Sequence, residues 1–282
     1  MSLSISILAS GSSGNCSALR FGRGMMLIDC GIGPRATARR MLGLHVGVED
    51  ISAICLTHLD SDHFNENWIE TIIRREIRVF CHESHEPDLR QRVRDPKFHR
   101  CVRTFNGKSF KPLHGVQAQA IHMPHDAAGS HAFRFHCDGG SVGYASDLGH
   151  VRRELIEFFA DVQVLAIESN YDPQMQRNSG RPAFLQRRIM GGHGHLSNQQ
   201  ALEAVRKILD QRNADRRDLP RHIVLLHRSR QCNCPQLVRG LFSTDARIAN
   251  RLTLAEQDQP TTWLRAAGEE NFLGRQLELQ WG

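Results

Sequence analysis

Several features that would place this 282-residue chain in other classes of protein are missing from its sequence. No apolar run approaches the roughly 20 residues that a membrane-spanning helix requires, so we expect no membrane contact. The eight cysteines are scattered, which argues against a disulfide framework and suits a reducing compartment. The N-terminus lacks the basic flank of a secretory signal and alternates apolar residues with serine. We therefore expect a first strand there and a cytoplasmic location.

A loop rich in glycine and serine at residues 9–16 lacks the lysine and the spacing of a P-loop, so it does not indicate that class of nucleotide site. Its backbone N–H groups could approach an anion, which makes Ser12, Ser13 and Asn15 candidates for binding a phosphate. A tight connection between two strands explains the same composition equally well.

The overall composition is that of a soluble globular protein with a large core, since 40% of the residues are hydrophobic and 23% are charged. No internal repeat, linker or low-complexity segment interrupts the sequence, so we predict one domain over residues 1–282. The net charge is +6 and Arg far outnumbers Lys, which favours a partner that carries phosphate. Sixteen histidines are many for this length and are consistent with a metal site.

One heptapeptide, residues 57–63, carries four side chains of metal-ligand type directly after an apolar, strand-like run at 51–56. These side chains are His58, Asp60, Asp62 and His63. Imidazole nitrogen and carboxylate oxygen are groups that bind zinc, iron and manganese. In a turn, the first two can face one ion and the last two a second. The alternative is a polar loop that caps the helix expected near Trp68, but a helix start does not need two flanking histidines.

Four more candidate residues lie at the ends of strand-like runs elsewhere in the chain. They are Asp29 in the run 25–30, His125 after 116–123, Asp147 after 141–145 and His227 after 223–226. An Asp at the end of a buried strand needs a partner, so we expect Asp29 to orient a ligand histidine, unless it is a plain turn carboxylate. Asp147 is well placed to bridge two ions, and His125 and His227 would complete the set.

Apolar alternation and helical spacing indicate the elements that connect these residues. Further strands are expected at 3–8, 77–81 and 162–167, with a hairpin of 132–136 and 141–145 about Asp138-Gly139-Gly140. Helices are expected at 34–42, from Trp68, at 84–94, within 174–192 and after Ser197. The stretch 98–113 has no regular pattern, and the tail 236–282 gives weak helix and then strand signals.

The helix expected after Ser197 is preceded by a further histidine, His195. Ser197 with Gln200 three residues later is a capping box. A helix N-terminus attracts phosphate oxygens, so His195 could bind one there, and an ordinary capping role is the alternative. Arginines near this segment and near His227 are candidates for contacts to further phosphates. They are Arg187, Arg188, Arg228 and Arg230.

Taken in order, these residues resemble the metallo-β-lactamase superfamily, whose pattern is H-x-H-x-D-H followed by single His, Asp and His residues. The pattern stands here as His58-x-Asp60-x-Asp62-His63, then His125, Asp147 and His227, with Asp29 before it. The resemblance covers residues 3 to 235 and rests on five motifs. It implies an α/β fold, the four-layer αββα metallo-β-lactamase sandwich, with the ligands on loops at one edge of two sheets.

Further motifs are similar to the YycJ/WalJ-like branch of that superfamily. They are Gly11-Ser12-Ser13-Gly14-Asn15-Cys16, Pro124-His125-Asp126-Ala127, Glu168-Ser169-Asn170, Gly194-His195-Leu196-Ser197-Asn198 and Leu226-His227-x-Ser229. That branch is associated with DNA exonuclease activity, and its relatives cleave other phosphodiesters. The resemblance, and not the spacing, implies a nucleic-acid substrate or another phosphodiester.

The sequence departs from the family pattern at Asp60, where the family has its second His. A retained carboxylate ligand makes the first metal site harder and more negative, which shifts preference from zinc toward manganese or iron. We expect Asp60 to ligate, because carboxylates replace this His in the superfamily's di-iron relatives. If it does not, the enzyme works with one tightly held ion or is impaired.

The resulting hypothesis is a hydrolase that uses two divalent metal ions to cleave phosphodiesters, most simply as a DNA exonuclease. One ion is assigned to His58, Asp60 and His125, the other to Asp62, His63 and His227, with Asp147 bridging. Catalytic roles fall to Asp62 and His195, and substrate binding to Ser12, Ser13, Asn15, Ser197 and Ser229. The alternatives are a phosphodiesterase for cyclic or nucleotide small molecules, and a metal-impaired scaffold that binds nucleic acid or protein.

Overall fold

The apolar runs of the sequence form two mixed sheets in a computed structural model, which describes residues 2–107 and 109–267. The first sheet contains, in spatial order, β14 (Leu264–Arg265), β1 (Leu3–Ala9), β2 (Cys16–Phe21), β3 (Gly24–Ile28), β4 (Ile51–Cys55), β5 (Arg78–His82) and β6 (Val102–Phe105). The second contains β13 (Leu252–Leu254), β12 (His222–Leu226), β11 (Val164–Glu168), β10 (Gly140–Ala145), β9 (Ser130–Cys137), β8 (Val116–Met123) and β7 (Phe110–Leu113).

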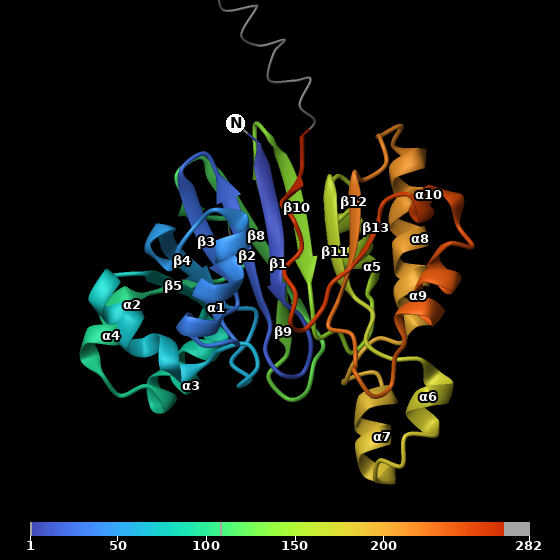
Figure 1. The fold of residues 1–282 in the computed structure, drawn as a ribbon, viewed down its shortest axis with the longest axis horizontal. Helices are drawn as coiled ribbons and strands as arrows, with labels where there is room; N and C mark the ends of the chain where they lie inside the picture. The colour runs from blue at the N-terminus through green and yellow to red at the C-terminus, as the bar shows by residue number, and fades with distance from the viewer. Residues whose placement is uncertain (1, 108, 268–282) are drawn as a thin grey trace, which may run out of the picture.

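Helices cover the outer face of each sheet, so that the molecule has four layers (Figure 1). The first sheet is covered by α1 (Pro34–Met41), α2 (Ile69–Arg75), α3 (Glu86–Arg92) and α4 (Pro96–Cys101). The second is covered by α5 (Arg153–Phe158), α8 (Asn198–Ala214), α9 (Pro235–Phe242) and α10 (Ala246–Ala249). Two helices, α6 (Pro173–Arg177) and α7 (Ala183–Met190), project at one end of the sandwich. No described helix is long and apolar enough to cross a membrane.

Short 3-10 turns complete the connections around the first sheet. They are η1 (Leu42–Leu44), η2 (Val48–Asp50), η3 (Glu66–Trp68) and η4 (Glu83–His85). The turn η3 leads directly into α2, so the helix expected from Trp68 begins one residue later than predicted. The Asn65 side chain caps this turn by accepting a hydrogen bond from the Asn67 N–H at 3.0 Å.

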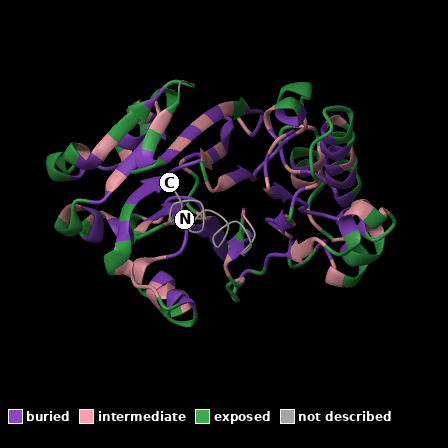
Figure 2. Ribbon diagram, turned by 90° about the horizontal axis from the view of Figure 1, so that it is seen from above, coloured by how far each residue is buried: buried purple, intermediate pink, exposed green. Residues whose placement is uncertain are grey.

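Each central strand buries both of its faces, which explains why the strands read as continuous apolar runs. In β3, Met26 and Ile28 pack between the two sheets, whereas Met25 and Leu27 pack under the helices of the first layer. Figure 2 shows buried residues along the strands and exposed residues on the outward faces of the helices. The core between the sheets contains side chains from both of them, for example Ile5 of β1 and Phe133 of β9.

The parallel strands bring several loops to one edge of the sandwich. Strands β3, β4, β5 and β6 run parallel in the first sheet, and β10, β11, β12 and β13 do so in the second. Positive φ angles occur just after β3, β10 and β12, with φ 56° at Asp29, 56° at Asp147, two residues beyond β10, and 54° at His227. This left-handed conformation is rare outside glycine and marks sites where tertiary contacts override local preference.

The prediction for residues 98–113 was wrong, because this stretch contains α4, β6 and β7 rather than irregular chain. The two strands have four residues each and lie at sheet edges, where few side chains alternate and the apolar pattern is weak. Strand β2 and helix α5 were also absent from the predicted elements. The tail contributes α9, α10, β13 and β14 up to residue 267. The part of the single-domain prediction at 268–282 lies outside the described residues.

Candidate metal centre

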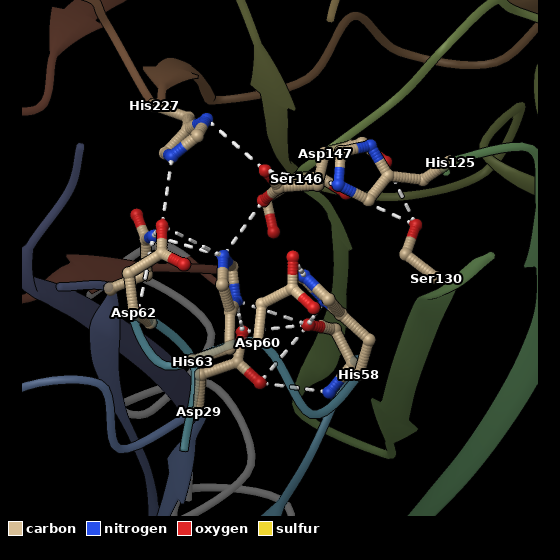
Figure 3. Close-up of polar contacts among 12 residues, drawn as sticks. Asp29, His58, Asp60, Asp62, His63, His125, Ser130, Ser146, Asp147 and His227 are labelled. Carbon is tan, nitrogen blue, oxygen red and sulfur yellow. Dashed lines mark hydrogen bonds and ion pairs between the residues drawn. The ribbon is translucent and has the colours of Figure 1, made fainter. Parts of the chain in front are cut away.

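Loops at the carboxyl edge of both sheets bring the seven predicted ligand residues together (Figure 3). The heptapeptide after β4 supplies His58, Asp60, Asp62 and His63, and the second sheet supplies His125, Asp147 and His227. The imidazole ring centroids of His58 and His63 are 4.0 Å apart, those of His58 and His125 5.3 Å, and those of His63 and His227 6.0 Å. Residues up to 169 positions apart in the sequence therefore meet in one cluster.

Within this cluster the side chains form four overlapping groups, in each of which one ligand atom per residue lies within 4.8 Å of the others. Two of the groups share no residue and contain the predicted ligands: His58, Asp60 and His125, and Asp62, His63 and His227. The other two contain Asp147, once with His58 and His63 and once with Glu168, His195 and His227. Asp147 Oδ2 is 2.9 Å from His63 Nε2, and its Oδ1 is 3.9 Å from His125 Nε2. The predicted assignment of these residues to two ions stays a prediction.

The chemistry of these residues fits a divalent metal ion. Two buried imidazole nitrogens, His58 Nε2 and His227 Nε2, make no hydrogen bond with any described residue, and the buried Asp147 Oδ2 faces His63 Nε2 at 2.9 Å. These residues are only 2–3% exposed, and an unsatisfied buried polar atom costs about 1–3 kcal/mol. Imidazole nitrogens and carboxylate oxygens that converge on one buried space are the donor set that transition metals bind.

The second nitrogen of each imidazole is occupied by the protein, which fixes the orientation of the rings. His63 Nδ1 lies 2.7 Å from Asp29 Oδ2, and His125 Nδ1 lies 2.9 Å from the Gly194 carbonyl oxygen. His227 Nδ1 lies 3.2 Å from a carboxylate oxygen of Glu168. Such contacts hold the Nδ1 proton and direct Nε2 toward the other ligand residues.

Asp29 makes the contact predicted for it and is fully buried. Besides His63, its carboxylate accepts hydrogen bonds from the Thr57 N–H at 2.8 Å and the Thr57 hydroxyl at 2.9 Å. Burial raises the pKa of Asp29, and the neighbouring His63 opposes that shift. The carboxylate thereby ties the end of β3 to the start of the heptapeptide.

The charges of the centre depend on one another. Burial alone would lower the pKa of His63, but Asp147 and Asp29 outweigh burial and raise the pKa well above its usual value. Burial and the adjacent His63 lower the pKa of His58 well below its usual value. Burial would raise the pKa of Asp147, but His227 and His63 outweigh it and lower that pKa. The buried carboxylates thus require positive charge beside them.

The loop at 9–16 contacts the heptapeptide and supports it by hydrogen bonds. The Asn15 N–H donates to the Asp62 carbonyl oxygen at 2.7 Å, and the Asn15 side-chain amide lies 3.3 Å from Asp62 Oδ2. The backbone N–H groups of Gly11, Ser13 and Gly14 are also engaged within the protein. A Cβ at Gly31 would lie 1.7 Å from the Asp62 carbonyl oxygen, so glycine is required there. The loop therefore supports the ligands and has few N–H groups to offer an anion.

Of the five residues predicted to bind substrate, only Ser12 lines the cleft over the centre, which has a volume of about 240 Å³. Asn15 is 1% exposed and contacts Asp62, as described above. The Ser197 hydroxyl accepts from the Gln200 N–H at 3.2 Å, which confirms the predicted capping box. The Ser229 hydroxyl accepts from the Cys232 N–H at 3.1 Å. These two hydroxyl groups stabilise turns, and their role toward substrate stays a prediction.

Glu168 is a residue to which the sequence analysis gave no role. It is fully buried at the end of β11, and its Oε1 lies 2.7 Å from His195 Nδ1. Its Oε2 accepts hydrogen bonds from the N–H groups of Leu148 and Leu196. Burial would raise the pKa of Glu168, but His195 outweighs it and lowers that pKa. A carboxylate at a strand end, as at Asp29 and Asp147, was the signal that could have identified it.

His195 lines the cleft with its other ring nitrogen turned away from Glu168. Its ring centroid lies 5.0 Å from that of His227 and 5.3 Å from that of His125. Its Nδ1 lies 3.6 Å from Asp147 Oδ1. The structure thus places His195 beside the metal-type ligands but on the cleft side of them.

Helix α7 forms one wall of the cleft through Leu185, Arg188 and Ile189. The Arg188 guanidinium makes a two-pronged contact with Asp126, the residue after His125, and its Nε lies 3.0 Å from Asp126 Oδ1. Hydrogen bonding from Arg188 lowers the pKa of Asp126. Of the four arginines predicted to contact phosphate, Arg188 is the one that lines the cleft.

Comparison with known proteins connects this geometry with a family. The family model described as the beta-lactamase superfamily domain matches residues 25–223. The chain is 26% identical to exodeoxyribonuclease YycJ of Bacillus anthracis over 244 residues, which are 85% of this chain and 87% of that protein. It is 26% identical to exodeoxyribonuclease WalJ of Streptococcus pneumoniae over 238 residues, which are 82% of this chain and 84% of that protein.

Solved structures of low sequence identity share the fold. The metallo-beta-lactamase fold protein YhfI from Bacillus subtilis has a TM-score of 0.67 at 13% identity, over 93% of this chain and 99% of that one. The short form of human tRNase Z has a TM-score of 0.62 at 16% identity, over 92% of this chain and 98% of that one. These likenesses confirm the predicted four-layer sandwich.

Replacement of Asp29 by Asn tests the buried support of the cluster. Asn keeps the size of Asp and tolerates the positive φ, but its NH₂ group cannot accept from Thr57 or His63. We expect the affinity for Mn²⁺ or Zn²⁺ to fall about 10- to 100-fold, measured by isothermal titration calorimetry. Asp88→Asn, on the exposed surface of α3, is the control and keeps full affinity. Unchanged metal affinity in Asp29→Asn would contradict this role.

Proposed function

This chain belongs to the beta-lactamase superfamily, and from that premise we propose that it is a metal-dependent hydrolase that cleaves the phosphodiester bonds of nucleic acid. The observation that carries the proposal is the convergence of four imidazoles and the Asp147 carboxylate at the floor of a cleft, with two imidazole nitrogens that have no hydrogen-bond partner among the described residues. The two exodeoxyribonucleases that match most of the chain supply the substrate class. DNA is therefore the substrate that we propose first.

The proposed ligand sets follow the two groups of side chains. His58, Asp60 and His125 would hold one divalent ion, and Asp62, His63 and His227 would hold the other. Asp147 would bridge them, since its two oxygens approach both groups. Two bound ions in such a site make water reactive near neutral pH and stabilise charge on the phosphoryl oxygens. The carboxylate of Asp60 favours manganese or iron over zinc in the first site.

The chain's own residues then have separate tasks. Asp29, the Gly194 carbonyl group and Glu168 hold the ligand imidazoles in one orientation. Asp62 is held by Asn15 and faces the cleft, where we assign it to the nucleophile side of the reaction. His195 is assigned to the leaving-group side, because Glu168 holds its Nδ1 and leaves Nε2 free to donate a proton.

A test of the function compares two substrates that share only the phosphodiester bond. The metal-loaded chain should hydrolyse bis(p-nitrophenyl) phosphate and should shorten a 5′-phosphorylated oligodeoxynucleotide in a salt-sensitive manner. His63→Ala should lose at least about 1,000-fold in both rates, because it removes a ligand and exposes the Asp29 carboxylate. The exposed His114→Ala is the control and should keep both activities.

The two rates also separate the proposed function from its alternatives. Hydrolysis of the small diester without degradation of any oligonucleotide would replace the nuclease with a small-molecule phosphodiesterase. Turnover in His63→Ala equal to that of the unaltered chain would reject the metal centre as the source of activity. A chain that retains no metal and hydrolyses neither substrate would support a binding scaffold instead.

The number of ions depends on Asp60. Its carboxylate is 55% exposed, and its Oδ2 lies 3.7 Å from His58 Nε2. Elemental analysis after equilibration with manganese should find two ions per unaltered chain and one per Asp60→Ala chain, since His58 and His125 alone bind weakly. Asp60→His should hold two ions and shift the preference toward zinc. Asp138→Ala, in the exposed β9–β10 turn, is the control, and two ions in Asp60→Ala would show that this carboxylate is no ligand.

The proposed role of His195 can be tested by comparing two substrates whose leaving groups differ in their need for a proton. An oligonucleotide leaves as an alkoxide that needs a proton, whereas p-nitrophenolate leaves without one. His195→Ala should therefore lower kcat about 10²- to 10⁴-fold on an oligonucleotide and less than about tenfold on bis(p-nitrophenyl) phosphate. His193→Ala, whose exposed side chain stands two residues away, is the control and should leave both rates unchanged. Equal losses on the two substrates would mean that His195 does not protonate the leaving oxygen.

A further inference from the structure

Helix α7 has one face fixed to the protein and another face left open beside the cleft. Tyr171, Ile189 and Cys232 form a small apolar cluster under the helix, and Leu185 and Met190 pack against it. The helix projects from the sandwich at the edge where the candidate metal centre lies (Figure 1). Its position is therefore set by packing, while the exposed side chains of its other face, Phe184 and Arg187, point away from that cluster.

Phe184 stands on this open face and is 67% exposed. Three large apolar side chains are exposed among the described residues, Leu42, Phe184 and Leu237. None of them lines the cleft, but Phe184 directly precedes Leu185, which does. Phe184 contributes little to the core, so folding does not explain a phenyl ring at this position. An exposed ring beside a cleft of catalytic type is instead a contact surface for something planar or apolar.

The helical spacing links Phe184 to the cleft. Arg188 lines the cleft and follows Phe184 by four residues, so their side chains are neighbours on one face of α7, about 5–6 Å apart at Cβ. That interval is comparable to one nucleotide of an extended single strand. A phosphate bound near the metal-type ligands and Arg188 would therefore place the base of the next nucleotide at Phe184.

The charges around Phe184 suit the same ligand. Arg187 and Arg188 follow it in the last turn of α7, and both are exposed. Arg188 is held by Asp126, which directs its guanidinium toward the cleft. The segment before the helix is also fixed, because the Arg181 side chain bonds to Gln176 and Gln231. A ring flanked by cations on a rigid support is the arrangement that binds single-stranded nucleic acid by stacking.

We propose that Phe184 is the stacking platform for the base of a nucleotide next to the scissile phosphate, so that the substrate enters as a single-stranded end. The proposal rests on the proposed nuclease function and names the form of nucleic acid that it takes. A base that stacks on Phe184 cannot at the same time remain stacked and paired within a duplex. Duplex ends must therefore fray before they reach the centre.

Kinetics on two substrates test the platform. Phe184→Ala should raise KM for a twelve-residue oligothymidylate about tenfold and leave kcat nearly unchanged, because the variant loses one stacked base. The same variant should hydrolyse bis(p-nitrophenyl) phosphate as fast as the unaltered chain, since Phe184 does not line the cleft in which that substrate binds. Phe184→Trp should restore the KM. Leu42→Ala removes a side chain that is 73% exposed elsewhere and is the matched control.

A direct readout comes from oligonucleotides with 2-aminopurine at one terminal position, whose fluorescence falls when the base stacks. Rapid mixing with the metal-loaded chain should quench one such probe before turnover, and Phe184→Ala should abolish the quenching. Unchanged KM and quenching in Phe184→Ala would overturn the platform while the nuclease function stands. The same would follow if the variant altered only the oligomeric state, because Phe184 would then contact protein. Failure of the unaltered chain to cleave any oligonucleotide would overturn the proposed function as well.

Discussion

Buried carboxylates that lack sufficient partners within the protein are the constraint on which the rest of this centre depends. Asp147 is 2% exposed, and its carboxylate oxygens face imidazoles, with Oδ2 2.9 Å from His63 Nε2 and Oδ1 3.3 Å from His227 Nδ1. Such an atom is costly to bury unless positive charge lies beside it. The surrounding imidazoles supply that charge only when protonated, and divalent cations supply it with the rings neutral. The electrostatic demand of these carboxylates therefore fits the centre for a divalent cation.

The fold meets this demand by turning the chain sharply at three strand ends. Asp29, Asp147 and His227 adopt left-handed backbone conformations within two residues of the ends of β3, β10 and β12. Each conformation is unfavourable for a residue with a Cβ, and tertiary contacts hold it in place. For example, the His227 N–H donates to the Ser10 hydroxyl at 2.7 Å. These unfavourable backbone conformations direct the side chains of Asp29, Asp147 and His227 into the ligand cluster.

The two halves of the sandwich contribute differently to the proposed chemistry. The first sheet provides the heptapeptide and its support from Asp29 and Asn15, which together form a rigid floor. The second sheet provides the residues nearer the cleft, including the Glu168–His195 pair. Helix α7 then adds Arg188 to the wall of the cleft and carries the exposed Phe184 four residues before it. This order, from buried ligand to exposed ring, matches the order in which a phosphate and its attached base would be recognised.

The sequence by itself determined the strand ends that carry His58, His63, His125 and His227, because alternation within a buried strand is local and ligand residue types are distinctive. It also predicted the capping box at Ser197 and the contact of Asp29, which follow from short-range rules. Only the tertiary structure decided that Glu168 supports His195, that Asn15 supports Asp62, and that Arg188 rather than Arg187 lines the cleft. It likewise decided that 98–113 forms α4, β6 and β7. Those outcomes depend on partners far away in the sequence, and a hydrogen bond or an edge strand has no local pattern that names its partner.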